Sequence, residues 1–209
     1  MMAAARGFVL RTRDGHSFRF DAGALCLELL LTGGPGPLAP FDTLHTPADL
    51  VRWAGDSRLP AGLDPVVTEA ELTAARALRD AVYGITMARI AGRKASVADL
   101  SVVNEAAALP PPVPCLTPAG ERGWVPGAGG SQLLSAVARD AVELFSGPYA
   151  ERVRECGAGD CRLLFVDTSR PGRRRWCSME RCGNRHKVRA HRARPTAADP
   201  NPNPGSAEG

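Results

Sequence analysis

The spacing of four cysteines near the C-terminal end constrains this chain more than any other feature of its sequence. Two identical pairs, Cys156-x4-Cys161 and Cys177-x4-Cys182, are separated by 15 residues. A structural Zn²⁺ site is tetrahedral and takes four thiolates or a mixture of cysteine and histidine ligands. Two equal pairs joined by a short insert are typical of such a site. The sequence therefore predicts one Zn²⁺ per chain, held by Cys156, Cys161, Cys177 and Cys182.

The segment around these pairs is too polar to fold on hydrophobic burial alone. Residues 151–194 contain few bulky apolar side chains, among them those of residues 163–166 and Trp176. Domains this small usually need a metal or disulfides, and zinc binding supplies folding free energy on the order of 10 kcal/mol. One alternative is four buried thiols without a metal; another is that His186 or His191 replaces one cysteine ligand. A zinc ion with four protein ligands has no open position for catalysis.

The same segment predicts a treble-clef-like zinc finger. A Pro-Gly turn at 171–172 would let residues 162–167 and 174–176 fold back on each other as a hairpin. Ser178 is expected to cap a helix, which places Cys182 in the first turn of that helix. A cysteine knuckle, a hairpin and a helix that carries the last ligand together make a treble clef.

Positive charge is concentrated in this segment. Residues 151–194 carry 13 basic and 5 acidic side chains, a net charge of +8, whereas residues 1–150 carry 13 basic and 15 acidic ones. On a helix that begins near Cys182, arginines recur at intervals of three and four and share one side. The residues predicted to contact DNA lie on this helix and in the preceding hairpin: Arg173, Arg174, Arg175, Arg181, Asn184, Arg185, Lys187, Arg189 and Arg192.

A phosphate backbone suits this cluster, because a guanidinium group pairs with phosphate in a fixed fork geometry. Asn184, Arg185 and Lys187 can also hydrogen-bond to base edges. Asn184 and Arg185 could equally brace the zinc loop through hydrogen bonds to backbone carbonyls. The alternative for the whole cluster is a solvated face or a platform for an acidic protein partner. A membrane surface fits less well, because the helix lacks a face of bulky apolar residues.

The first 150 residues predict a mainly helical domain with small β hairpins. Residues 8–20 alternate around Asp14-Gly15, which favours a hairpin, and residues 113–117 and 122–125 favour a second one. Capping residues precede apolar repeats at helical spacing, so helices are expected to begin at Thr46, Thr68 and Ser96, with a further helix at 131–145. Three prolines at 110–112 end the third helix. Pro148 is expected to start a short helix that leads to Cys156.

Charge and composition divide the chain into three parts. We expect a helical domain at 1–150, a zinc finger at 151–194 and a disordered tail at 195–209. The first ten residues are too short and interrupted for the apolar region of a signal peptide. The longest apolar run, 24–31, falls short of the roughly 20 residues that span a bilayer. We therefore expect a cytoplasmic protein, in which grouped cysteines bind metal instead of forming disulfides.

Catalytic patterns are missing from the sequence, and we expect no enzymatic activity. His16 and His45 come with no glycine-bracketed serine, no phosphate loop and no carboxylates at metal spacing. Other residues that could line a pocket or act as nucleophiles are more typical of a core: Cys26, Trp53, Tyr83, Cys115 and Trp124.

The motif Cys182-Gly183-Asn184-Arg185, within the cysteine spacing above, closely resembles the CGNR zinc finger. The agreement extends through residues 164–170 and 174–179. CGNR fingers typically follow a domain called ABATE, and such proteins are regarded as candidate stress-induced, ligand-binding transcription regulators of bacteria. The resemblance implies zinc on the four cysteines and contact between the finger and double-stranded DNA.

The front half is similar to the ABATE pattern over shorter stretches. The ABATE pattern has an early motif similar to Leu-Asp-Phe-x-Asn-Thr, which corresponds to residues 27–32 of this chain. Glu28 stands where the motif has Asp, and Leu31 stands where it has Asn, so a ligand site built on this motif would be altered. The later segment Asp49-Leu50-x-x-Trp53 fits better. The predicted function is a zinc-dependent DNA-binding transcription regulator, responsive to a small-molecule ligand or to stress through an N-terminal sensing or homodimerising domain. The alternative is an adaptor whose basic finger docks on an acidic protein.

Overall fold

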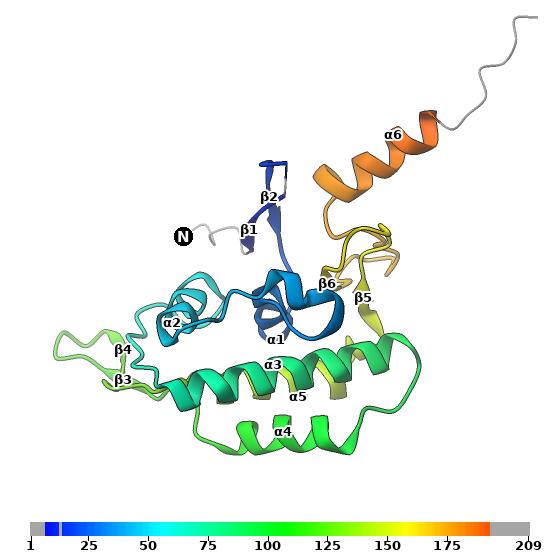
Figure 1. Ribbon diagram of the computed structural model, residues 1–209. Helices are drawn as coiled ribbons and strands as arrows, with labels where there is room; N and C mark the ends of the chain where they lie inside the picture. Colours follow the sequence, from blue (N-terminus) through cyan, green and yellow to red (C-terminus); the bar gives the residue numbers. More distant parts are fainter. Residues whose placement is uncertain (1–6, 13, 193–209) are drawn as a thin grey trace, which may run out of the picture.

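A layer of long helices forms the lower part of the molecule in Figure 1, and the cysteine-rich segment lies above one end of that layer. The computed structural model describes residues 7–12 and 14–192. The predicted tail at 195–209 lies outside these residues. The architecture confirms the predicted fold class, which is mainly α with small two-stranded hairpins and a C-terminal treble-clef-like finger. Among the described residues, every helix is either too short or too polar to span a bilayer.

Three helices make up the layer: α3 (Glu69–Ile90), α4 (Val97–Ala108) and α5 (Gly130–Ser146). Each packs against the other two. The apolar repeat predicted for α3 is buried along one face of that helix, from Leu72 to Ile85. The short helix α1 (Leu25–Leu29) is completely buried against α3 and α5, and α2 (Pro47–Asp56) packs on α3.

Capping side chains begin these helices where the sequence predicts. The Thr68 hydroxyl accepts a hydrogen bond from the Glu71 N–H at 3.2 Å, and the Glu71 carboxylate accepts one from the Thr68 N–H at 2.9 Å. The other carboxylate oxygen of Glu71 accepts from the Ser131 N–H at 2.9 Å, in the first turn of α5. Burial opposes ionisation of Glu71, but the hydrogen bonds from Ser131 and Thr68 outweigh it and lower the pKa of Glu71. One carboxylate thus caps two neighbouring helices.

We expect Glu71→Gln to lower the free energy of unfolding by about 1–2 kcal/mol, because charged hydrogen bonds to two helix starts become neutral or are lost. Chemical denaturation at neutral pH, followed by circular dichroism, measures the change. Glu69→Gln is the matched control, since Glu69 is exposed in the same helical turn. Equal stability of the two variants would contradict the double-cap role.

Both hairpins predicted in the front half are present. The first pairs β1 (Phe8–Arg11) with β2 (Ser17–Phe20), and the second pairs β3 (Pro114–Leu116) with β4 (Arg122–Trp124). In the first hairpin the Thr12 N–H donates to the His16 carbonyl at 2.8 Å, so the connecting loop is longer than the predicted two residues.

The third hairpin differs from the prediction. Strand β6 (Leu164–Val166) pairs with β5 (Val153–Glu155), so the predicted pairing of 162–167 with 174–176 is wrong. The first cysteine pair reverses the chain, which lets Val153 lie opposite Val166 with both side chains buried. The helix expected from Pro148 to Cys156 is also wrong, since only a single 3-10 turn (Ala150–Arg152) precedes β5.

The finger packs directly on the N-terminal domain of the chain. The Val166 N–H donates to the Ala22 carbonyl at 2.8 Å, and one cluster of buried residues runs from α3 through Phe165 to the cysteines. Gly23 has a φ of +84°, and a Cβ there would lie 2.9 Å from the Val166 Cβ, so this contact needs glycine. Independent folding of residues 1–150 stays a prediction.

Candidate metal centre

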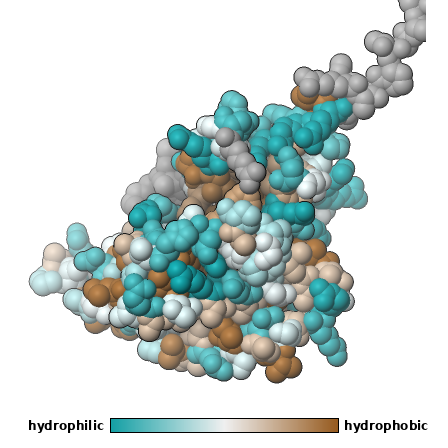
Figure 2. Space-filling model, viewed as in Figure 1, coloured by the Kyte–Doolittle hydropathy of each residue, from teal (hydrophilic) through white to brown (hydrophobic). Residues whose placement is uncertain are grey.

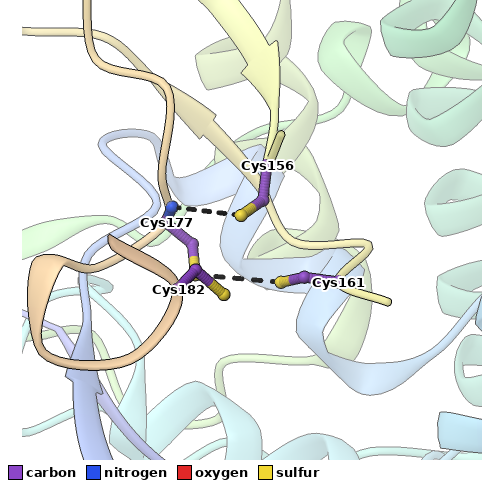
Figure 3. A group of neighbouring side chains, drawn as sticks. All are labelled: Cys156, Cys161, Cys177 and Cys182. Atoms are coloured by element: carbon purple, nitrogen blue, oxygen red, sulfur yellow. Dashed lines mark hydrogen bonds between the residues drawn. The ribbon is translucent and has the colours of Figure 1, made fainter. Parts of the chain in front are cut away.

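Four elements bring the paired cysteines together. Cys156 follows β5, Cys161 precedes β6, Cys177 lies in the loop after β6, and Cys182 lies in the helical turn η4 (Met179–Gly183). All four are buried, and their Sγ atoms lie within 4.8 Å of one another (Figure 3). His186 instead stacks on Trp176, with ring centroids 4.7 Å apart, so the nearer of the two alternative histidine ligands is engaged elsewhere.

The geometry of the sulfur atoms fits a tetrahedral zinc ion. The Sγ of Cys177 lies 3.8 Å from that of Cys161 and 3.5 Å from that of Cys182. Zinc–sulfur bonds of about 2.3 Å in a tetrahedron place the sulfurs about 3.8 Å apart. The donor set and its spacing therefore form one zinc site, as predicted.

The four thiols need a cation if all are to ionise. Hydrogen bonding with Cys156 raises the pKa of Cys161 to about 12, and it also raises the pKa of Cys177. Four thiolates at these distances repel one another, and a dication among them removes that repulsion and holds the sulfurs ionised. The backbone N–H of Cys177 also points at the Cys156 Sγ, 3.4 Å away, and favours its charged form.

The last ligand is placed by a capped, wide helical turn. The Ser178 hydroxyl accepts from the Glu180 N–H at 3.1 Å, which confirms the predicted cap. The turn η4 has π-helical geometry and continues into α6 (Asn184–Arg192). Gly183 packs under Met179, where a Cβ would lie 2.6 Å from the Met179 Sδ. A side chain at this position would therefore have to displace the exposed end of Met179.

Asp167, which the sequence interpretation did not single out, organises the loop between the two cysteine pairs. It is completely buried. One carboxylate oxygen accepts from the N–H and the hydroxyl of Ser169, at 3.0 and 2.6 Å, and the other accepts from the Arg174 N–H at 2.8 Å. Burial opposes ionisation of Asp167, but these hydrogen bonds and the charge of Arg152 lower its pKa. An acid directly after an apolar strand is the only sequence signal for this role.

Two of the predicted DNA contacts have partners inside the finger. The Arg174 guanidinium donates to the carbonyls of Trp176 and Cys177 and lies 4.1 Å above the Phe165 ring. The Arg185 guanidinium donates to the Asp160 carboxylate at 2.6 Å and lies 3.8 Å from the Cys182 Sγ. Arg185 therefore ties α6 to the first cysteine pair. It does so through the Asp160 carboxylate, whereas the sequence suggested hydrogen bonds to backbone carbonyls. Whether either arginine also touches DNA stays a prediction.

The remaining predicted contacts lie around the same end of the molecule. Exposed side chains belong to Arg173, Arg175, Asn184, Lys187 and Arg189. Arg175 also lies 4.9 Å above the Trp176 ring. Arg181 is turned toward the β1–β2 hairpin, 4.9 Å above the Phe18 ring. Arg192 is the last residue of α6, and its side chain lies outside the described part of the structure.

The ABATE-like motif of the front half lies in the core. Glu28 is 1% exposed, and its carboxylate accepts hydrogen bonds from the Arg58 N–H and side chain at 2.9 and 2.8 Å. Burial raises the pKa of Glu28 in spite of Arg58. The Trp53 indole donates to the Glu28 carbonyl at 3.1 Å, so the two matched segments of the front half contact each other. This arrangement ties α1 and α2 together and leaves Glu28 inaccessible to a ligand.

Comparison with known proteins divides the chain at the same place as its charge. Residues 23–148 match the model of the ABATE family, described as "Putative stress-induced transcription regulator". Residues 152–195 match the model of the CGNR zinc finger. A search of curated proteins finds no match.

Proposed function

The chain belongs to the ABATE family and carries a CGNR zinc finger, and we propose that it is a zinc-dependent transcription regulator that binds double-stranded DNA. We further propose that the protein is cytoplasmic. We also propose that it has no catalytic activity, because four cysteine ligands leave the zinc no open position for a substrate. It also includes a response to a small-molecule ligand or to stress.

The main support is positive charge that has no internal partner. Of the five acids in residues 151–194, Glu151 and Glu155 pair with Arg89 and Arg162. Asp160 pairs with Arg185, and Asp167 is buried under its own hydrogen bonds. Of these five acids, Glu180 alone is exposed and has no ion pair in the described part of the chain.

The exposed basic side chains therefore repel one another until an external anion binds. In the described part of the chain, no ion pair reaches Arg173, Lys187 or Arg189. Figure 2 shows hydrophilic side chains gathered over the end of the molecule that carries α6. Phosphates of a duplex are spaced to neutralise such a group of charges.

The zinc site supports the proposal because it fixes the start of α6. Cys182 lies in the turn that continues into α6, and Arg185 holds that helix to the first cysteine pair. Arg174 holds the 173–175 segment to the zinc loop. The basic side chains thus project from a rigid support, which suits recognition of a regular phosphate backbone.

We test the proposal by titrating duplex DNA with the full-length, zinc-loaded protein at increasing salt. Counterion release lowers log affinity by about 0.9 per phosphate for each unit of log salt, so about four to six contacts give a slope of roughly −4 to −5. Arg189→Ala is expected to flatten the slope by about one unit and to weaken all sequences alike. Fluorescence anisotropy measures both quantities.

The control is Arg93→Ala, which removes the same charge from an exposed position of the front domain and is expected to leave the slope unchanged. Equal slopes for Arg189→Ala and Arg93→Ala would contradict contact by α6. If the zinc-loaded protein binds no duplex even at low salt, the regulator proposal fails, and the finger is an adaptor for an acidic protein.

A further inference from the structure

A cavity of about 1100 Å³ lies between the finger and the N-terminal part of the chain. Its walls are the β1–β2 hairpin, the 3-10 turns η1 (Leu30–Thr32) and η2 (Gly36–Phe41), the first cysteine pair, and the start of α6. This volume is slightly above the range of about 300–1,000 Å³ that is usual for pockets of small organic molecules.

One side of the cavity is apolar and comes from the front of the chain. Its side chains are Leu10, Phe18, Leu30, Leu31, Leu38 and Phe41. Phe18 is buried, whereas Phe41 is half-exposed. A ligand that fits this side needs an apolar body, because burial of that surface is the main favourable term available there.

The opposite side is cationic and comes mainly from the finger. Five arginines and three acids line the cavity. Two of these arginines are already paired, Arg162 with Glu155 and Arg185 with Asp160. Arg181 has no ion pair and no side-chain hydrogen bond within the described ranges, although its charge helps to lower the pKa of Asp14. Its Nε is buried, as is that of Arg185, so the outer N–H groups of the Arg181 guanidinium are the ones that can donate to an anion in the cavity.

We propose that this cavity binds an amphipathic organic anion, with a carboxylate at Arg181 and an apolar body against the Phe18 and Phe41 side. The proposal deepens the ligand response of the proposed function and rests on that function only for its regulatory consequence. Binding itself requires neither DNA nor the regulator role.

The position of the cavity links this ligand to the zinc finger. Arg181 directly precedes the zinc ligand Cys182, and Asn184 and Val188 of α6 also line the cavity. An anion at Arg181 therefore touches the turn that sets the direction of α6. It also neutralises positive charge beside the exposed basic side chains, which lowers the affinity of the finger for DNA phosphates.

The test uses isothermal titration calorimetry of the full-length, zinc-loaded protein without DNA, with octanoate, octanol and acetate as probes. Octanoate offers both parts of the ligand, octanol lacks the charge and acetate lacks the apolar body. We expect octanoate to bind at least about tenfold more tightly than octanol, because hydrogen bonds to charged groups are the stronger ones. Acetate is expected to give no measurable heat.

Variants separate the two sides of the cavity. Arg181→Met keeps an apolar stem beside Phe18 and is expected to weaken octanoate about tenfold without changing octanol. Arg181→Lys restores most of the preference, and Arg93→Met is the charge-matched control. Phe41→Ser is expected to weaken octanoate and octanol alike. Zinc content is measured for each variant, since Arg181 adjoins a zinc ligand.

The proposal is overturned if octanoate binds no better than octanol, or if Arg181→Met and Arg93→Met bind octanoate equally. If Arg181→Met loses zinc, the comparison of Phe41→Ser with the unaltered protein decides, and unchanged octanoate binding overturns the proposal. Failure of octanoate to bind while DNA binding persists refutes this inference and leaves the proposed function standing.

Discussion

Cys177→Ser is expected to release the zinc and to unfold the finger. The Cys177 Sγ lies 3.8 Å from that of Cys161 and 3.5 Å from that of Cys182, and the cluster of possible metal ligands in the described residues consists of the four cysteines. Structural zinc contributes about 10–16 kcal/mol to the folding of small fingers, which is more than any other single interaction available to this segment. Elemental analysis of the purified variant is expected to show less than stoichiometric zinc.

The helices of the N-terminal domain are expected to persist in Cys177→Ser, because their caps and their buried apolar faces do not involve the metal. Far-UV circular dichroism measures this directly. The matched control is Cys115→Ser, a partly exposed cysteine of β3 that is expected to keep full zinc content. Retention of stoichiometric zinc by Cys177→Ser would contradict the site, and collapse of all helicity would contradict the division of the chain near residue 150.

The helices and the metal ligands were predictable because their signals are local. A hydroxyl such as Thr68 with an acid three residues later specifies a helix start wherever the chain folds. The cysteine pairs specify a zinc site by their spacing alone. For this reason the predicted helices at 46, 68 and 96 and the four zinc ligands are confirmed by the fold, and only their surroundings needed the structure.

Pairings between distant residues could not be predicted from local signals. Nothing in the local sequence of residues 174–176 excludes a strand. In the structure, however, the Arg174 N–H donates to the Asp167 carboxylate and is not available to pair with β6, which pairs with β5. Arg185 looked equally suited to bases and to bracing, and only the fold shows Asp160 within reach of it. Helix α1 was missed because its apolar run has no periodicity, as expected for a segment buried on all sides.

Asp167→Ala is expected to have the second largest effect, a loss of about 2–5 kcal/mol in the free energy of unfolding of the finger. The substitution removes three part-buried hydrogen bonds and leaves the N–H groups of Ser169 and Arg174 without acceptors beside a fully buried position. Each buried donor left unpaired costs about 1–3 kcal/mol. Asp167→Asn keeps the shape and one acceptor oxygen, so a smaller loss is expected. Thermal unfolding at fixed zinc concentration measures the series.

This loop also connects stability to the proposed DNA contact. Asp167 fixes the backbone of Arg174, and the exposed Arg173 and Arg175 on either side take their positions from it. We therefore expect Asp167→Ala to weaken duplex binding about tenfold even where zinc is saturating, since badly placed cations lose their phosphate contacts. Glu180→Ala is the control, because it removes an exposed carboxylate from the same finger, and it is expected to leave stability unchanged. If Asp167→Ala binds DNA as the unaltered protein does, Arg173 and Arg175 are not part of the DNA contact, which then rests on α6 alone.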